Sequence, residues 1–220
     1  MRELIITADG SHTLYVPEMD EHYHSIYGAV QESQFIFIKN GFEVSKADPL
    51  NILEIGFGTG LNAFLTAIKS MEGKRRVNYT TVEKYPLPAD IIDALNYHTY
   101  AGEGTGELFR LIHKTRWNSE VNISKNFSIK KIEADVTQSI PDGGYDLIYF
   151  DAFGPDKQPE MWSEEVFMRI ASLTNENGIL VTYSAKGQVK RILKICGFEV
   201  TLLPGPPGKR QIIRADKKAN

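Results

Sequence analysis

Four acidic residues lie where four predicted strands end. They are Glu54, Glu83, Asp135 and Asp151, and each comes at or just after an apolar or β-rich run. In an open sheet of parallel strands, ligands bind at the edge formed by the carboxyl ends of the strands. One acid at that edge is unremarkable. Four acids predict a cleft suited to a cationic ligand that also carries hydroxyl and amine groups.

A glycine-rich turn follows the first of these strands. Gly56, Gly58 and Gly60 come directly after the apolar run 52–55, and a helix-period pattern begins at the next residue. Glycine can adopt a positive φ and lets the backbone approach a ligand closely, and the free N–H groups of a helix start can bind a carboxylate or phosphate. A dinucleotide site requires G-x-G-x-x-G, whose third glycine comes one residue later than here. An ordinary turn between strand and helix needs only one glycine.

The run E-x-G-x-G-x-G, from Glu54 to Gly60, resembles motif I of the class I S-adenosyl-L-methionine-dependent methyltransferases. The resemblance implies that S-adenosyl-L-methionine is the cofactor. Glu54 would lie near its amino-acid end, Glu83 on its ribose and Asp135 near its adenine amine, while Asp151 would face the methyl group. The implied cofactor-binding residues are Glu54, Gly56, Gly58, Gly60, Asn62, Glu83, Asp135 and Asp151. A nicotinamide site, and a plain surface carboxylate at Glu83, remain open.

The alternation of strand and helix patterns predicts a doubly wound α/β fold. The resemblance implies a mostly parallel, seven-stranded, Rossmann-like sheet. The predicted strands are 52–55, 77–83, 127–133, 145–150, 178–184, 198–203 and 211–214. Helices are expected after Gly60, over 89–97, after Ser163 and over 189–196.

A small N-terminal extension precedes the main domain. A β-hairpin is predicted over residues 4–16, with its turn at Asp9-Gly10, and a helix over 26–39 that ends at Asn40-Gly41. We expect two parts, the extension at 1–48 and a methyltransferase domain at 49–220. Within the second part, Leu108, Leu111 and Ile112 suggest a short helix in the stretch 98–126. Whether that stretch forms part of a substrate pocket or a surface excursion remains open.

Composition limits the class of protein. A hydrophobic content of 42% and a charged content of 24% are typical of a soluble globular protein, and no apolar run is long enough to cross a bilayer. Cys196 is the only cysteine, which excludes an internal disulfide. His22 and His24 have no third ligand at a fitting spacing, so we expect no metal site. We expect a cytoplasmic protein.

A second motif narrows the resemblance. Residues 151–162 read D-x-F-x-P-x-K-x-P-E-M-W and resemble the signature of the methyltransferase domain in the bifunctional tRNA wobble-uridine enzyme. The segments around Asp9, Tyr23 and Gly205, together with Glu32 and Asn40-Gly41, resemble other parts of that domain. The family methylates the amine of 5-aminomethyluridine to complete 5-methylaminomethyl-2-thiouridine. The sequence resembles the stand-alone form, without room for the flavin-dependent oxidase domain. A separate flavin-dependent or aminomethyl-forming modification enzyme is then expected to supply the substrate.

The reaction implied by the resemblance requires a neutral amine. An alkylamine is mostly protonated at neutral pH, and an ammonium has no lone pair. Asp151 is the candidate catalytic residue that orients the amine and accepts its proton; the alternative is that Asp151 only caps the strand end. Most of the acceleration should come from aligning the amine with the methyl group.

The tRNA anticodon loop is the expected partner. Tyr23 is a candidate for closing the pocket, and Phe153 or Trp162 for stacking on the base, although both are equally consistent with core positions. Residues 186–220 hold nine lysines and arginines against two acids, which fits either a solvated tail or a phosphate contact. The candidate phosphate-binding residues are Lys157, Lys209 and Arg210.

Two other functions remain open. One is a small-molecule amine methyltransferase or an aminopropyltransferase, which share this fold and its acidic loops. The other is a non-catalytic S-adenosyl-L-methionine-binding module that pairs with an oxidase. The intact run from Asp151 to Trp162 argues against the silent module.

Overall fold

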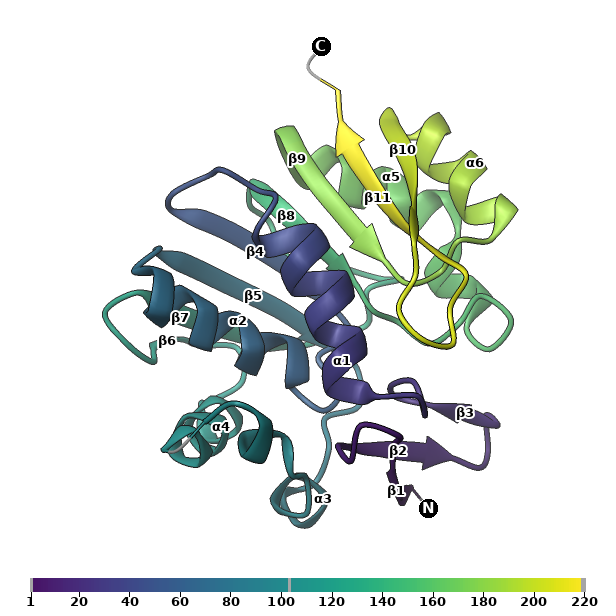
Figure 1. Cartoon of the computed structure of the whole chain (residues 1–220). Helices are drawn as coiled ribbons and strands as arrows, with labels where there is room; N and C mark the ends of the chain where they lie inside the picture. The colour runs from purple at the N-terminus through teal and green to yellow at the C-terminus, as the bar shows by residue number, and fades with distance from the viewer. Residues whose placement is uncertain (1, 103, 219–220) are drawn as a thin grey trace.

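A computed structural model describes residues 2–102 and 104–218; the outer limits predicted for the two domains, residues 1 and 220, lie outside them. Eight strands form the main sheet in the order β10-β11-β9-β8-β4-β5-β7-β6 (Figure 1). The strands are β4 (Leu50–Ile55), β5 (Val77–Glu83), β6 (Glu120–Asn122), β7 (Phe127–Glu133), β8 (Tyr145–Phe150), β9 (Thr174–Thr182), β10 (Phe198–Pro204) and β11 (Gln211–Lys217). The mixed α/β fold with a mostly parallel sheet is confirmed.

The seven predicted strands are all present, and β6 is an additional one. It pairs antiparallel with β7 at the edge of the sheet. Its three residues are too few to show an alternating pattern, so this strand could not be predicted from the pattern of the sequence. β4, β5, β7, β8 and β9 pair in parallel, whereas β11 lies antiparallel between β9 and β10.

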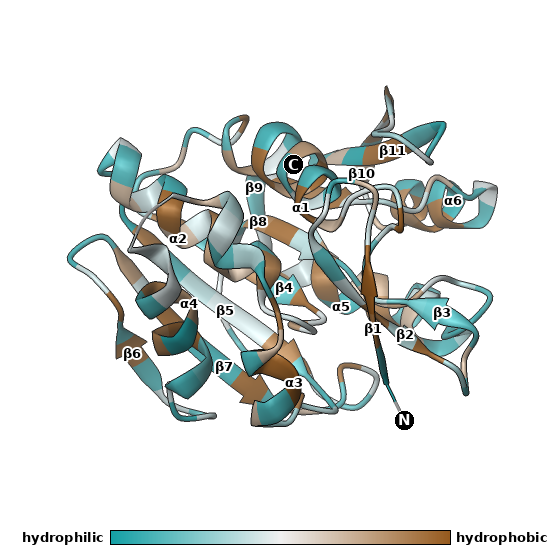
Figure 2. Ribbon diagram, turned by 60° about the horizontal axis from the view of Figure 1, so that its bottom comes forward, coloured by the Kyte–Doolittle hydropathy of each residue, from teal (hydrophilic) through white to brown (hydrophobic). Residues whose placement is uncertain are grey.

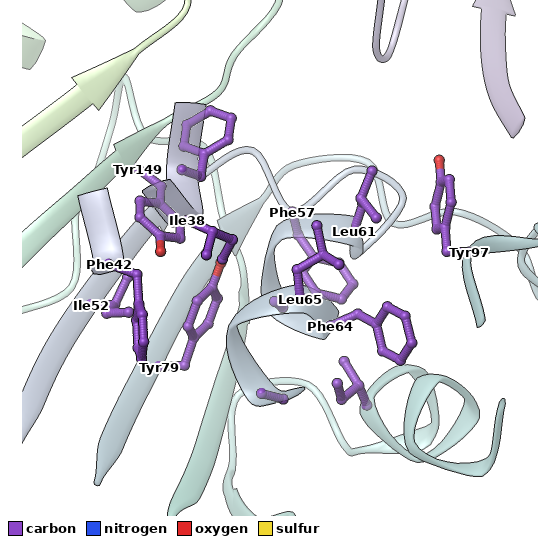
Figure 3. Packing of buried hydrophobic residues seen from close by; sticks show 14 of the residues in the cluster. Ile38, Phe42, Ile52, Phe57, Leu61, Phe64, Leu65, Tyr79, Tyr97 and Tyr149 are labelled. Carbon is purple, nitrogen blue, oxygen red and sulfur yellow. The ribbon is translucent and has the colours of Figure 1, made fainter. Parts of the chain in front are cut away.

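The central strands are buried on both faces because their side chains alternate between two apolar clusters. In β4, Leu50 and Ile52 belong to one cluster, and Leu53 and Ile55 to the other. The first cluster contains the labelled residues of Figure 3, where Tyr79 and Tyr149 of the sheet pack near Ile38 and Phe42.

Helices cover the two faces of the sheet as two layers (Figure 1). One layer contains α1 (Ala29–Ser33), its π-helical continuation η1 (Gln34–Phe42), α2 (Leu61–Gly73) and α4 (Thr105–Lys114). The other contains α5 (Glu164–Leu173) and α6 (Gly187–Ile195). The alternating brown and teal of α4 and α6 in Figure 2 reflects one apolar face and one polar face on each helix. Among the described residues, no helix has the length and apolarity needed to span a membrane.

The N-terminal hairpin is confirmed. β1 (Glu3–Ile6) pairs antiparallel with β2 (His12–Val16), and β2 pairs with a short β3 (Glu21–His22). At the turn, Asp9 accepts hydrogen bonds from Ser11 N (2.9 Å) and, with its second oxygen, from Gln31 N (3.0 Å). This carboxylate therefore ties the hairpin to α1. The division at residues 48 and 49 stays a prediction, since η1 shares an apolar cluster with β4 and α2.

The first helix differs from its predicted limits. It begins at Ala29 and continues to Phe42, beyond the predicted stop at Asn40-Gly41. The Asn40 side chain donates to Phe35 O within the helix (2.7 Å). A Cβ on Gly41 would lie 3.1 Å from atoms of Tyr149 and Val181, so this glycine allows close packing on the sheet rather than ending the helix.

One further helix also differs from its predicted limits. The helix predicted over 89–97 is only α3 (Ala89–Asp93), followed by a 3-10 turn, η2 (Tyr97–Tyr100). Chain direction changes there because the Asn96 side chain accepts from His12 N (2.8 Å) and donates to Gly10 O (3.0 Å). The short helix suggested by Leu108, Leu111 and Ile112 is present as α4, in which Ile112 is buried and Leu111 is 45% exposed.

Candidate active site

A cavity of about 510 Å³ opens at the carboxyl ends of the parallel strands. Eight of the predicted site residues line it: Tyr23, Gly56, Gly58, Glu83, Asp135, Asp151, Phe153 and Lys209. Glu54, Gly60, Asn62, Lys157 and Arg210 do not line it. None of the described residues within 98–126 lines it either; α4 packs on α2, and β6 joins the edge of the sheet.

The glycine turn brings the backbone to the cavity. Gly56 has φ 90° and Gly58 has φ 50°, both in the region that disfavours a side chain. A Cβ on Gly56 would lie 2.7 Å from Asp151 O, and one on Gly58 would lie 3.1 Å from Tyr23 Cδ1. Gly60 (φ 73°) instead faces the His113 ring, behind the turn. Two of the three glycines thus face the cavity, and the third permits helix packing.

Glu83 and Asp135 form the wall beside this turn. Glu83 accepts hydrogen bonds from Gly58 N (3.0 Å) and Tyr85 N (2.8 Å). Asp135 accepts from Thr137 N (2.9 Å) and forms an ion pair with Lys84 (2.7 Å). The bond from Lys84 and the bonds from Thr137 hold the pKa of Asp135 below its ordinary value. Asp135 therefore presents a negative charge to the cavity at neutral pH.

Glu54 lies beneath the turn, not in the cavity. It is fully buried, beside the side chains of Thr81, Asn62 and Tyr79, without a hydrogen bond of regular geometry among the described residues. Burial raises the pKa of Glu54 to about 8, and the charge of Asp151 acts in the same direction. Glu54 is therefore mostly neutral at pH 7. It lies where it supports the glycine turn from below and does not line the cavity.

Asp151 is held at the end of β8 by both its backbone and its side chain. Its N–H donates to Ile55 O (2.9 Å), and its Oδ2 accepts from Asn62 Nδ2 (2.8 Å). Asn62 in turn accepts from Ser33 Oγ (2.7 Å), so α1 and α2 together orient the carboxyl. Burial, followed by the charge of Glu32, raises the pKa of Asp151 to about 7. A carboxyl near neutrality is suited to accepting a proton from a bound substrate.

Glu32 and Tyr183 also line the cavity and were not predicted. Glu32 is 8% exposed, its Oε2 accepts from Ser25 N (2.9 Å), and its Oε1 lies 3.1 Å from Lys209 Nζ. Lys209 Nζ also lies 4.6 Å from the centre of the Tyr183 ring. Tyr183 directly follows β9, so the reasoning that selected acids at strand ends could have included it. Glu32 belongs to the N-terminal part of the sequence that resembles the family, but that resemblance assigns it no role.

The N-terminal segment covers the glycine turn. The Tyr23 ring meets Phe153 edge-on, with centroids 4.9 Å apart, and Tyr23 Oη accepts from Arg2 Nε (3.1 Å). His24 Nε2 lies 2.7 Å from Thr59 Oγ1. Burial lowers the pKa of His24 to about 4, so this imidazole is neutral and serves to attach the segment to the turn.

Three other predicted residues lie away from the cavity. Trp162 ends a short 3-10 turn, η3 (Pro159–Trp162), is 1% exposed and donates to Phe153 O (2.8 Å). It is a core residue that holds the loop and cannot stack on a base, which corrects that expectation. Lys157 Nζ lies 3.8 Å from Asp20 Oδ2, and Arg210 is exposed in the β10–β11 turn.

In the described part of the chain, no three His, Cys, Asp or Glu side chains gather as a metal site would require.

Comparison with known proteins agrees with this geometry. A family model described as S-adenosyl-L-methionine-dependent methyltransferase matches residues 108–218. The tRNA 5-methylaminomethyl-2-thiouridine biosynthesis bifunctional protein MnmC of Campylobacter hominis is 30% identical over 206 residues, which cover 92% of this chain and 31% of that protein. MnmC of Cupriavidus metallidurans is 32% identical, with 96% and 33% covered. The chain thus spans about a third of the length of these curated relatives.

Two solved structures superpose on the chain. MNMC2 from Aquifex aeolicus superposes with a TM-score of 0.83 at 27% identity, covering 100% of this chain and 72% of that one. Spermidine synthase from Thermotoga maritima superposes with a TM-score of 0.61 at 13% identity, covering 100% and 70%. The second likeness concerns the fold alone.

Proposed function

The chain belongs to the family of S-adenosyl-L-methionine-dependent methyltransferases, and from this premise we propose that it methylates the amine of 5-aminomethyluridine, or of its 2-thio form, at the wobble position of tRNA. The product is 5-methylaminomethyl(-2-thio)uridine. The observation that carries the proposal is the cavity in which Asp151 stands beside the glycine turn, with a pKa near neutrality. The likeness to the MnmC proteins supports the choice of acceptor.

S-adenosyl-L-methionine is the cofactor of the family, and the residues present fit it. The cavity of about 510 Å³ is in the range of small-molecule and cofactor sites. Gly56 and Gly58 leave the space that a Cβ would fill. We assign Glu83 to the ribose hydroxyls and Asp135 to the adenine amine, with the glycine turn at the amino-acid end. Bound there, the cofactor supplies an electrophilic methyl group on a positively charged sulfur.

The protein's own contribution is to hold the amine and remove its proton. Asp151, oriented by Asn62, lies at the same edge as the glycine turn and is half ionised near pH 7. It can accept a hydrogen bond from the amine and then its proton, which leaves the nitrogen lone pair free. Alignment of the amine with the methyl group contributes up to ~7–11 kcal/mol in well-oriented systems.

The nucleic-acid side of the proposal rests on the residues around the cavity mouth. Tyr23 and Phe153 line the cavity, and we assign them to packing against the uracil ring. Lys157, Lys209 and Arg210 remain proposed phosphate contacts in the anticodon loop. With tRNA as substrate the reaction takes place in the cytoplasm. Another modification enzyme, flavin-dependent or aminomethyl-forming, is the proposed source of the acceptor.

The test is transfer of labelled methyl to tRNA from cells that lack this protein, with nucleoside analysis of the product. We expect 5-methylaminomethyl nucleoside to form, and the apparent affinity for tRNA to fall steeply as salt rises, because phosphate contacts release counterions. Methylation of free small amines with no transfer to tRNA would instead identify a small-molecule enzyme. Tight cofactor binding without any transfer would identify a silent module.

Glu83→Gln is expected to weaken S-adenosyl-L-methionine binding roughly 10- to 100-fold, the loss that accompanies removal of a charged hydrogen-bond acceptor. Isothermal titration calorimetry measures this directly. Glu133→Gln is the matched control, because Glu133 ends the neighbouring strand at the same register but is exposed outside the cavity. Equal cofactor affinities for both variants would remove Glu83 from the ribose site.

A further inference from the structure

A second carboxylate, Glu32, lines the same cavity as Asp151, and its charge acts on that of Asp151. It comes from α1 in the N-terminal segment, whereas Asp151 comes from the end of β8. It is 8% exposed. The Ser25 N–H holds its Oε2 in place (2.9 Å). A buried charge on a helix that faces a cavity is costly without a partner. Glu32 therefore needs a cation beside it, and the chemical type of that cation indicates which ligand the site can bind.

The cation at Glu32 is a primary ammonium. Lys209 Nζ lies 3.1 Å from Oε1, over the Tyr183 ring at 4.6 Å from its centre. The contact with Oε1 is an ion pair without hydrogen-bond geometry, which leaves acceptor capacity on that oxygen. Tyr183 Oη donates to Ala152 O (2.9 Å), next to Asp151, which fixes the ring. A carboxylate and an aromatic face thus already hold the functional group that an aminomethyl acceptor carries.

The Lys209 side chain can move away from Glu32. It lies in the turn between β10 and β11, and its side chain is 26% exposed. The side chain is long and flexible, and its ammonium keeps its charge when it moves into solvent or onto a phosphate. A charged acceptor that entered the cavity would meet the same carboxylate and ring.

We propose that Glu32 and Tyr183 form the recognition site for the acceptor's protonated amine, and that Lys209 is a resident counter-ion which the acceptor displaces. This inference rests on the proposed function, because it names the residues that recognise its acceptor. Once the ammonium lies between Glu32 and Asp151, its proton passes to Asp151. The nitrogen lone pair then forms the new C–N bond, while the electrons of the broken C–S bond stay on sulfur. The released Lys209 is free to pair with an RNA phosphate.

The test compares two anticodon stem-loop RNAs that differ only in the wobble base, 5-aminomethyluridine or uridine. Binding of each to the protein with S-adenosylhomocysteine is measured by calorimetry, and the ratio of the two Kd values reports recognition of the amine alone. The wild type should prefer the aminomethyl RNA. Glu32→Gln should reduce that preference roughly 10- to 100-fold, with unchanged affinity for the uridine RNA.

Lys209→Gln should act in the opposite way. The uridine RNA carries no amine to displace Lys209 from Glu32, so its affinity should change little, while the preference for the aminomethyl RNA is kept or increased because the competing ammonium is gone. Glu72→Gln, which removes a carboxylate from an exposed lysine ion pair on α2, should change neither quantity. Should Glu32→Gln fail to fold, the ratio of the two Kd values measured with Lys209→Gln tests the inference.

The pH dependence gives a second readout. The groups that face Asp151 are Glu32 from α1, Glu54 from β4, Tyr79 from β5, Tyr183 after β9 and Lys209 from the β10–β11 turn. Because the Glu32 charge raises the pKa of Asp151 and the Lys209 charge lowers it, the acidic limb of the rate profile should move to lower pH in Glu32→Gln and to higher pH in Lys209→Gln.

An unchanged preference in Glu32→Gln, or a preference lost in Lys209→Gln, would overturn the inference and leave the proposed function standing. A wild type that methylates no aminomethyl RNA would overturn both. The two failures are therefore distinguishable.

Discussion

Asp151→Asn is expected to lower the rate of methyl transfer about 10²–10⁴-fold, the usual contribution of a positioned proton acceptor. Asparagine has almost the same shape, and its side-chain oxygen can still accept from Asn62 Nδ2, as the carboxylate does over 2.8 Å. It cannot take a proton from the amine. Cofactor affinity should change little, so the loss should appear in single-turnover rates at saturating cofactor and tRNA.

Asp156→Asn is the control for this experiment. Asp156 lies on the same loop but is exposed, and it pairs with Lys186. Its replacement should leave the rate within about twofold of the wild type, as expected for a surface ion pair. An Asp151→Asn enzyme with a rate near that of Asp156→Asn would show that the carboxylate only holds the loop.

The same substitution should change the pH dependence of stability. Because the pKa of Asp151 is raised from 3.8 to about 7 in the folded state, ionisation of this carboxyl opposes folding. The folded protein therefore loses stability from this group as pH rises from about 4 to 7. Asp151→Asn removes the titration, so its free energy of unfolding should fall less with pH over that window. Urea unfolding at pH 4.5 and pH 7.5 measures the difference.

Gly56→Ala is expected to have the second large effect. Gly56 has φ 90°, and an added Cβ would lie 2.7 Å from Asp151 O, a backbone atom that cannot move alone. The conformation costs about 1–2 kcal/mol for a residue with a side chain. Relief of the contact displaces the glycine turn from the end of β8. A shift of about 1 Å at a reacting centre lowers the rate on the order of 10²-fold, so we expect both a lower melting temperature and at least that loss of rate.

Gly73→Ala is the matched control. Gly73 ends α2, and a Cβ there would meet no atom within 4 Å. Alanine is favoured over glycine in a helix by up to about 1 kcal/mol, so this variant should be as stable as the wild type or more so, with unchanged activity. If both alanine variants behaved alike, close approach of the backbone at Gly56 would not matter.

The parts of the site that could be predicted follow strand periodicity. Glu83, Asp135 and Asp151 stand at strand ends, and parallel strands bring their ends to one edge whatever the details of packing. Glu54 satisfies the same rule, but it is the penultimate residue of β4, and its side chain points beneath the turn into the core. Glu54 is level with Thr81 and Tyr149, two residues before Glu83 and Asp151 in register, and this offset separates a buried support from the cavity wall.

The parts that could not be predicted depend on contacts between distant segments. The pairing of Glu32 with Lys209 requires the N-terminal segment and the β10–β11 turn to meet over the cavity, and no local pattern reports this. Asn40-Gly41 has the appearance of a helix stop, yet Gly41 is needed for close packing on Tyr149 and Val181. Trp162 could be either a stacking platform or core by type alone, and its burial decides for the core.

The meeting of Glu32 and Lys209 has a consequence for synthesis of the protein on the ribosome. The glycine turn and Asp151 emerge well before the β10–β11 turn, and β11 must insert between β9 and β10 to complete the sheet. A nascent chain arrested after β9 therefore carries Asp151 and Glu32 but not Lys209. Such contacts between distant segments form late in folding. The cavity, whose lining includes Gly208 and Lys209 of the β10–β11 turn, should thus be complete only after β11 has emerged from the ribosome.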